Sequence, residues 1–167
     1  LACKGSGDIQ IATEPLPTEV PTEDSGEDIH FDLDALIDVS IEMDEADFDT
    51  LRGEARSFLD LLTGECIDQS FESPFTWFEA DIVVDGQEAE RVGIRKKGFL
   101  GSLSEEKPSL KLKLDKFVDG QRFGGTERIT LNNQLQDPAV VRACLTYGVF
   151  ETLGVPAPRC NFARVRM

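Results

Sequence analysis

The chain has 167 residues, of which 40% are hydrophobic and 29% charged, and its formal net charge is −15. This length suits one domain, and the composition excludes collagen-like sequence, wholesale disorder and a membrane-spanning helix. The charge is unevenly placed, because residues 1–90 hold 25 acidic and 3 basic side chains whereas residues 91–167 hold 7 and 14. The second half is therefore the part suited to a phosphate or another anion.

The start of the chain resembles the end of a bacterial lipoprotein signal. Leu1 and Ala2 precede Cys3, and a polar stretch of Gly and Ser follows. We expect Cys3 to be the lipidated residue of an exported, cell-surface or outer-membrane lipoprotein, held to the membrane by its lipid anchor only. The alternative is an ordinary cysteine near a trimmed terminus. Residues 1–30 are acidic and rich in Pro, Ser and Thr, which predicts a disordered linker ahead of a domain over 31–167.

The domain is expected to open with a strand and a helix. Residues 39–43 alternate apolar and polar side chains, as a half-buried strand does. Asp44 then serves as the N-cap of a helix, whose apolar residues recur at helical spacing from Phe48 to Leu62. We expect this helix to run for about five turns and to stop at Gly64. The acidic residues around it lack the spacing of a calcium loop and are interpreted as caps and a solvated face.

Four further strands are predicted from alternation and turn residues. Residues 80–84 and 87–94 flank Asp85-Gly86, the dipeptide that favours a two-residue hairpin turn. Residues 107–114 place three leucines on one face and Ser109, Lys111 and Lys113 on the other, and residues 128–131 form a short strand. These elements predict an α+β domain built on an antiparallel sheet with two main helices.

The second main helix is expected to have Asp137 as its N-cap and Pro138 in its first position, and to stop at Gly154. Its apolar face would be formed by five residues: Val141, Leu145, Val149, Phe150 and Leu153. Residues 161–167 then begin another strand, and we expect the chain to be part of a longer protein.

The cysteines predict one disulfide. Cys144 and Cys160 are the favoured pair in an exported protein, because this bond would join the second helix to the strand that follows it. Cys66 then has no assigned partner. No cysteine or histidine spacing predicts a metal site, and His30 is the only histidine, which excludes a histidine-based catalytic triad within the chain.

The candidate site is a glycine-bearing loop between two predicted strands, with Arg95 and Lys97 before it and Lys107 and Lys111 after it. Glycines allow backbone N–H groups to approach phosphates, and cations neutralise their charge. The loop is not a Walker loop, since it lacks that spacing and leads to a strand. From the spacing alone, the plain alternative is a solvated strand face for the lysines and an ordinary turn for the asparagines at 132 and 133.

Six segments, in this order along the chain, resemble the CotH kinase family, proteins similar to the spore coat protein H kinases. They are residues 92–98, 107–111, 117–123, 131–133, 136–138 and 153–158. The resemblance extends over residues 39–167 and covers the N-terminal portion of the family.

The resemblance implies the N-terminal part of a protein-kinase-like fold, truncated before its C-terminal lobe. Such a protein binds ATP and Mg²⁺ and transfers the γ-phosphate to Ser or Thr of a protein. By motif, several residues would serve the nucleotide. Those that would face its phosphates are Arg95, Lys97 and Lys107, with Lys111 a further candidate, and those that would shape the covering loop are Gly98, Gly101 and Ser102. Asn132 and Arg142 would have structural roles.

The family's metal-binding and catalytic Asp residues are expected beyond Met167, so no catalytic or metal residue is assigned here and this chain alone is expected to be inactive. A non-catalytic surface-assembly or adhesion module on the same fold is the alternative. A polyanion-binding module is a third possibility. Nucleic acid is not expected as a partner, because the basic segment offers few aromatic residues for base stacking, namely Phe99, Phe117 and Phe123.

Overall fold

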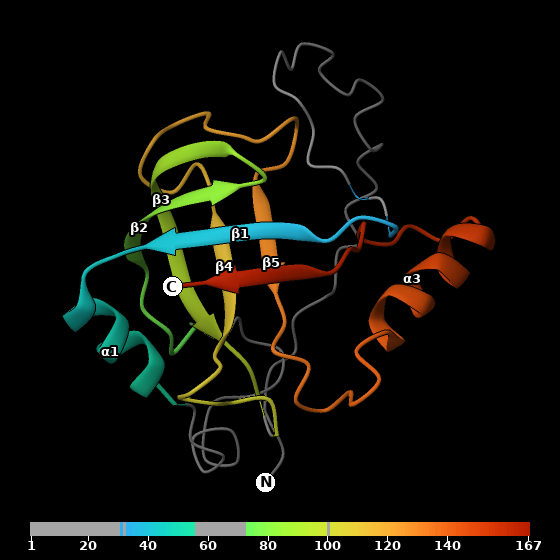
Figure 1. Cartoon of the computed structure of the whole chain (residues 1–167), viewed down its shortest axis with the longest axis horizontal. Coiled ribbons are helices and arrows are strands. Elements are labelled where there is room, and N and C mark those ends of the chain that lie inside the picture. Colours follow the sequence, from blue (N-terminus) through green and yellow to red (C-terminus); the bar gives the residue numbers. More distant parts are fainter. Residues whose placement is uncertain (1–30, 32, 56–72, 100) are drawn as a thin grey trace, which may run out of the picture.

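The computed structural model describes residues 31, 33–55, 73–99 and 101–167. Within them the chain forms a six-stranded sheet and two helices (Figure 1). In chain order these are β1 (Ile37–Glu42), α1 (Glu45–Gly53), β2 (Phe78–Val84), β3 (Gln87–Lys97), β4 (Ser109–Lys113), β5 (Arg128–Leu131), α3 (Arg142–Thr152) and β6 (Ala163–Arg166). The predicted α+β class is confirmed, whereas the protein-kinase-like fold stays a prediction.

Some of the sequence predictions lie outside the described residues. They concern the linker over 1–30 with its Cys3, the later part of the first predicted helix, and Cys66.

The sheet has the strand order β5-β4-β3-β2-β1-β6 and curls, so that in Figure 1 β1 and β6 cross in front of β4 and β5. Strands β1 to β5 pair with antiparallel neighbours, but β6 runs parallel to β1. The expectation of a purely antiparallel sheet was therefore wrong at this edge. The reason is the connection: the chain leaves β5, passes through α3 and returns on the opposite edge of the sheet, a crossover that permits parallel pairing.

The β2–β3 hairpin forms as predicted. Asp85 and Gly86 have φ values of 48° and 85°, the left-handed conformations that a tight two-residue turn needs. Further along, the pairing register shifts, since Ala80 lies opposite Val92 whereas Ile82 lies opposite Ala89. Strand β3 thus contains one extra residue, a β-bulge that decides which of its side chains face the core.

One face of the sheet is buried and forms the core. Its innermost residues come from five elements, α1 and β1 to β4, or lie just after β4: Val39, Ile41, Leu51, Ile82, Val84, Val92, Ile94, Leu110, Leu112 and Leu114. The predicted leucine face of β4 is confirmed. Because strand side chains alternate, Arg95, Lys97 and Lys111 lie on the opposite, outer face. Ser109 shares that face but is buried rather than solvated.

Helix α1 begins where the sequence predicts and ends earlier. The carboxylate of Asp44 accepts hydrogen bonds from the backbone N–H groups of Ala46 and Asp47, at 2.8 and 3.2 Å. The helix ends at Gly53, because Glu54 adopts extended backbone. The buried Lys96 ammonium donates to the carbonyl oxygens of Arg52 and Glu54 and so satisfies the exposed acceptors of that terminus.

Helix α3 begins at Arg142, four residues later than Pro138, where it was expected to start. Asp137 does not cap a helix at that point. Its side chain accepts from the N–H groups of Ala139 and Arg142, at 3.2 and 2.8 Å, and so bridges a turn. Val140 lies within this turn with φ of 63°, a conformation that no helix contains.

The C-terminal end of α3 is the predicted one. Gly154 has φ of 70°, its N–H donates to the Glu151 carbonyl, and the N–H of Val155 donates to the Phe150 carbonyl. This is the Schellman arrangement, which favours glycine. The expected disulfide between Cys144 and Cys160 is also present, with 5.3 Å between the two Cα atoms.

The apolar face of α3 does not pack on the sheet. No residue of α3 is buried, and Leu145 and Leu153 are 64% and 70% exposed. Figure 1 shows the helix standing away from the strands. An open apolar groove of about 500 Å³ runs along it, lined in part by Leu33, Val141, Leu145, Val149 and Phe162. Among the described residues, no helix is long and apolar enough to cross a membrane.

Candidate functional site

Apart from Lys113, which is ion-paired with Asp115, three cations gather on the outer face of β3 and β4. Arg95 of β3 lies directly opposite Lys111 of β4, and Lys97 follows Arg95 by two residues on the same face. Within the described residues, none of the three forms an ion pair with an acidic side chain. We refer to Arg95, Lys97 and Lys111 as the cationic face. Its charge is available to an external anion.

Lys97 is the most constrained member of the cationic face. Its ammonium donates a hydrogen bond of 2.6 Å to the side-chain oxygen of Asn132. Burial lowers the pKa of Lys97, and the neighbouring charge of Lys111 lowers it further. A bound anion would raise the pKa of Lys97 again, since a nearby negative charge favours the protonated lysine. The predicted structural residue Asn132 thus contacts the candidate site directly.

The loop over residues 98–107 depends on its two glycines. Gly98 and Gly101 have φ values of 146° and 79°, which side chains rarely adopt. A Cβ at Gly98 would lie 3.1 Å from a Leu103 methyl carbon, and one at Gly101 would overlap the Gln136 amide. The Ser102 hydroxyl donates to the Phe99 carbonyl and accepts from the Phe99 N–H, both at 2.9 Å. Ser102 therefore stabilises the turn at the start of the loop.

Asn133 fastens this loop to the sheet, a role that the sequence analysis did not assign. It is only 6% exposed, and its side-chain amide donates to the carbonyls of Ser102 and Lys107, both at 2.9 Å. Its backbone N–H donates to the Ser109 hydroxyl at 3.0 Å. One buried side chain thus holds the middle and the C-terminal end of the loop. The available sequence signal was the position of Asn133 directly after an apolar strand, but we interpreted Asn133 as an ordinary turn residue.

The two remaining predicted residues are Lys107, which belongs to the loop, and Arg142, which does not. Lys107 ends the loop with an exposed side chain, and its N–H donates to the Ser104 hydroxyl at 3.0 Å. Arg142 lies at the start of α3, where its guanidinium is 3.4 Å from the Asp137 carboxylate. Arg142 therefore contacts the turn before the helix.

Trp77 is the second residue that the sequence analysis missed. Its ring lies against Arg95, with 4.5 Å between the guanidinium carbon and the ring centroid. The only sequence signal was its position, one residue before β2, as the single tryptophan of the chain.

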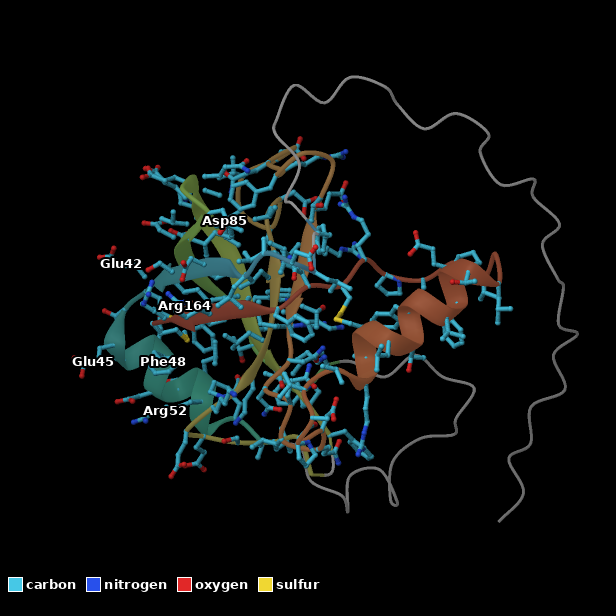
Figure 2. The ribbon with its side chains drawn as sticks, turned by 45° about the vertical axis from the view of Figure 1, so that its right-hand side comes forward. Glu42, Glu45, Phe48, Arg52, Asp85 and Arg164 are labelled. Carbon is cyan, nitrogen blue, oxygen red and sulfur yellow. A yellow bond between two sulfur atoms is a disulfide. The ribbon has the colours of Figure 1, made fainter. Side chains whose placement is uncertain are left out.

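Two acidic side chains, Glu105 and Glu106, lie in the loop itself, and both are exposed. Figure 2 shows Glu42 and Glu45 pointing away from the ribbon, at the end of β1 and the start of α1. In the described part of the chain, no group of three or more His, Cys, Asp or Glu side chains could hold a metal ion. The residues described thus suit the phosphates of a nucleotide but do not fit a protein-bound Mg²⁺.

The sequence was also compared with models of known protein families. The sequence model of the CotH kinase protein family matches residues 94–167, which include the cationic face, the loop and Asn133. The suspected relationship to the CotH kinase family is therefore confirmed over this segment, and it indicates a kinase-like function. A comparison with curated proteins found no matching relative.

Proposed function

We propose that this chain is the nucleotide-binding part of a CotH-type protein kinase, which transfers the γ-phosphate of ATP to Ser or Thr of a protein. The observation that carries this proposal is the cationic face: three cations that have no acidic partner among the described residues, beside a glycine-bearing loop, in the segment that matches the family. Phosphoryl transfer depends mostly on positioning and on neutralising phosphate charge, which is what such residues supply.

The role of each residue follows from its place. Arg95 offers a planar fork of donors that matches phosphate oxygens, while Lys97 and Lys111 supply compact charges. Lys107, at the exposed end of the loop, would reach the phosphates from the side of the solvent. Gly98 and Gly101 allow the loop backbone to fold closely over them.

Among the described residues, no group of three or more His, Cys, Asp or Glu side chains could hold Mg²⁺, which would add to the neutralisation of phosphate charge when bound. We expect the cations of this chain to bind the phosphates of ATP. We further propose that the protein is exported and anchored through a lipid on Cys3. Labelling with a radioactive fatty acid, compared between the native protein and Cys3→Ser, tests the anchor separately from nucleotide binding.

Isothermal titration of ATP into the chain tests the main proposal. Loss of a charge-assisted contact costs about 1.5–3 kcal/mol, so Lys107→Ala and Lys111→Ala should each weaken binding by about tenfold or more. Arg122→Ala is the matched control, because Arg122 is ion-paired with Glu127 at 2.6 Å and lies outside the cationic face. Equal affinities for native protein, Lys107→Ala and Lys111→Ala would show that the phosphate assignment is wrong.

A non-catalytic surface-assembly or adhesion module is the second candidate. The exposed apolar face of α3 favours it, since an apolar surface of this kind is typical of a contact with another protein segment. The same titration separates the two functions. An assembly module needs no affinity for ATP, whereas the kinase proposal requires affinity that depends on Lys107 and Lys111.

A further inference from the structure

Trp77 contacts the cationic face from the segment that precedes β2. Its ring centroid is 4.5 Å from the Arg95 guanidinium carbon and 6.0 Å from the Lys116 ammonium nitrogen. Both the ring and Arg95 are half-buried. An arginine stacked at this distance is attracted by the ring's quadrupole, and part of its side-chain freedom is lost before any ligand arrives.

Gly93 explains why the ring can lie there. A Cβ at this position would lie 2.5 Å from the Lys116 Cβ and Cγ atoms and 3.2 Å from Cε3 of Trp77. Gly93 is not among the residues with positive φ, so its backbone does not require glycine. The missing side chain instead leaves room on the outer face of β3. The Lys116 stem and the Trp77 ring occupy that room, two residues from Arg95.

We propose that Trp77 is a positioning residue for anion binding: its ring holds the Arg95 guanidinium on the cationic face, so that the donors of Arg95 meet phosphate oxygens beside Lys97 and Lys111. This inference rests on the proposed function, because it takes the cationic face to be the phosphate site. It adds a residue outside the segment that matches the family.

The physical gain is preorganisation. A free arginine side chain loses rotamer entropy when it binds a ligand, and that loss weakens affinity. Stacking on Trp77 fixes the plane of the fork in advance. A phenylalanine ring would keep most of this contact, whereas a leucine side chain would keep the apolar volume and lose the π-face.

Because Trp77 is the only tryptophan, the tryptophan fluorescence of the chain comes from this ring alone. The experiment titrates sodium triphosphate, and separately ATP without metal, into the full chain while emission and binding heat are recorded. The emission of Trp77 should change and saturate at the same ligand concentration as the heat. Trp77→Leu should weaken binding of both ligands by about three- to tenfold, and Trp77→Phe by less than about twofold.

Arg95→Lys provides a second variant, which keeps the charge and loses the stacked fork. It should weaken triphosphate binding, and adding Trp77→Leu to it should weaken binding no further, since both changes remove the same contact. Thermal unfolding followed by circular dichroism checks that each variant folds. Should Trp77→Leu not fold, the emission change of the native protein and the behaviour of Arg95→Lys decide the question.

The outcomes separate this inference from the proposed function. If the native chain binds neither ligand, the phosphate site itself is wrong and the inference falls with it. If the native chain binds both and Trp77→Leu binds them equally well, only the role of Trp77 is wrong. A loss confined to ATP would also overturn that role, because the ring would then contact the base rather than position Arg95.

Discussion

The sheet and the C-terminal segment of this protein are stabilised in different ways. Strands β2, β3 and β4 bury one face almost completely, whereas neither α3 nor β6 contains a buried residue. Instead, covalent and polar contacts hold the C-terminal segment: the disulfide between Cys144 and Cys160, the turn at Asp137 and the parallel pairing of β6 with β1. Figure 2 shows the disulfide as the yellow bond beside α3.

This difference bears directly on the candidate site. Arg95, Lys97 and Lys111 belong to strands whose opposite side is the core, so their positions depend on buried apolar packing. The ion pairs of β6 contribute little by contrast, because Arg164 and Arg166 are both exposed at 3.5 Å from the Asp38 carboxylate. The cationic face should therefore persist when the C-terminal segment is loosened.

Truncation of a core residue in β3 should have the largest effect on the free energy of unfolding. Ile94 is 0% exposed, and Ile94→Ala should lower the free energy of unfolding by about 3–4 kcal/mol through lost burial and a cavity. Leu145→Ala in α3 is the matched control and should change it by less than about 0.5 kcal/mol. Urea unfolding followed by circular dichroism measures both. Similar losses for the two variants would contradict the division into a packed sheet and an unpacked helix.

Removal of the disulfide should loosen only the C-terminal segment. The two cysteines are 16 residues apart, a loop for which the chain-entropy model gives about 3 kcal/mol. In Cys144→Ser/Cys160→Ser, hydrogen exchange should accelerate at the amides of α3 and β6. The amides of β3 and β4 serve as internal controls and should keep their protection. A parallel loss of protection in β3 would mean that the sheet depends on α3 after all.

Asn133→Ala should have an intermediate effect, centred on the loop. The substitution removes donors from the Ser102 and Lys107 carbonyls, each of which is 2.9 Å from the buried amide nitrogen. We expect a loss of about 2 kcal/mol in the free energy of unfolding and faster exchange across residues 102–109. Asn132→Ala, which alters an exposed neighbour, should cost less than about 0.5 kcal/mol. Equal costs for the two asparagines would refute the clamping role of Asn133.

Local patterns predicted the parts of the fold that local chemistry decides. The Asp85-Gly86 turn and the leucine face of β4 follow from backbone preference and alternation, and both are present. The helix predicted as far as Gly64 fails at Gly53 for a tertiary reason: Lys96, distant in sequence, binds the carbonyls at that end. Helical spacing carries no information about such a partner.

The candidate site was predictable in its cations but not in its supports. Charge and glycine placement pointed to Arg95 and the loop, whereas Trp77 and Asn133 act through contacts that form only after folding. Parallel pairing of β6 also escaped prediction, because it depends on the route of the crossover through α3 rather than on strand composition.

The smallest predicted effect concerns the pH dependence of the cationic face. Burial and the charge of Lys111 lower the pKa of Lys97, so Lys97 loses its proton at a lower pH than an ordinary lysine. Lys97→Arg keeps the positive charge throughout, because arginine stays protonated. Between pH 8 and pH 10, the native chain should lose about threefold more affinity for ATP than Lys97→Arg does. Titration calorimetry at several pH values measures the difference.

The free energy of unfolding should also depend on the Lys97 proton, but it should change with pH in the direction opposite to the ATP affinity. A lysine whose folded pKa is lowered binds fewer protons in the folded chain than in the unfolded one, so the free energy of unfolding rises with pH between the two pKa values. Burial lowers the pKa of Lys96 as well, although Glu105 and Glu54 oppose the shift, and this contribution is the same in both proteins. The rise should therefore be smaller in Lys97→Arg than in the native chain. Two outcomes would contradict this role of Lys97. One is that ATP affinity and stability change in the same direction with pH, and the other is that the native chain and Lys97→Arg have equal pH slopes.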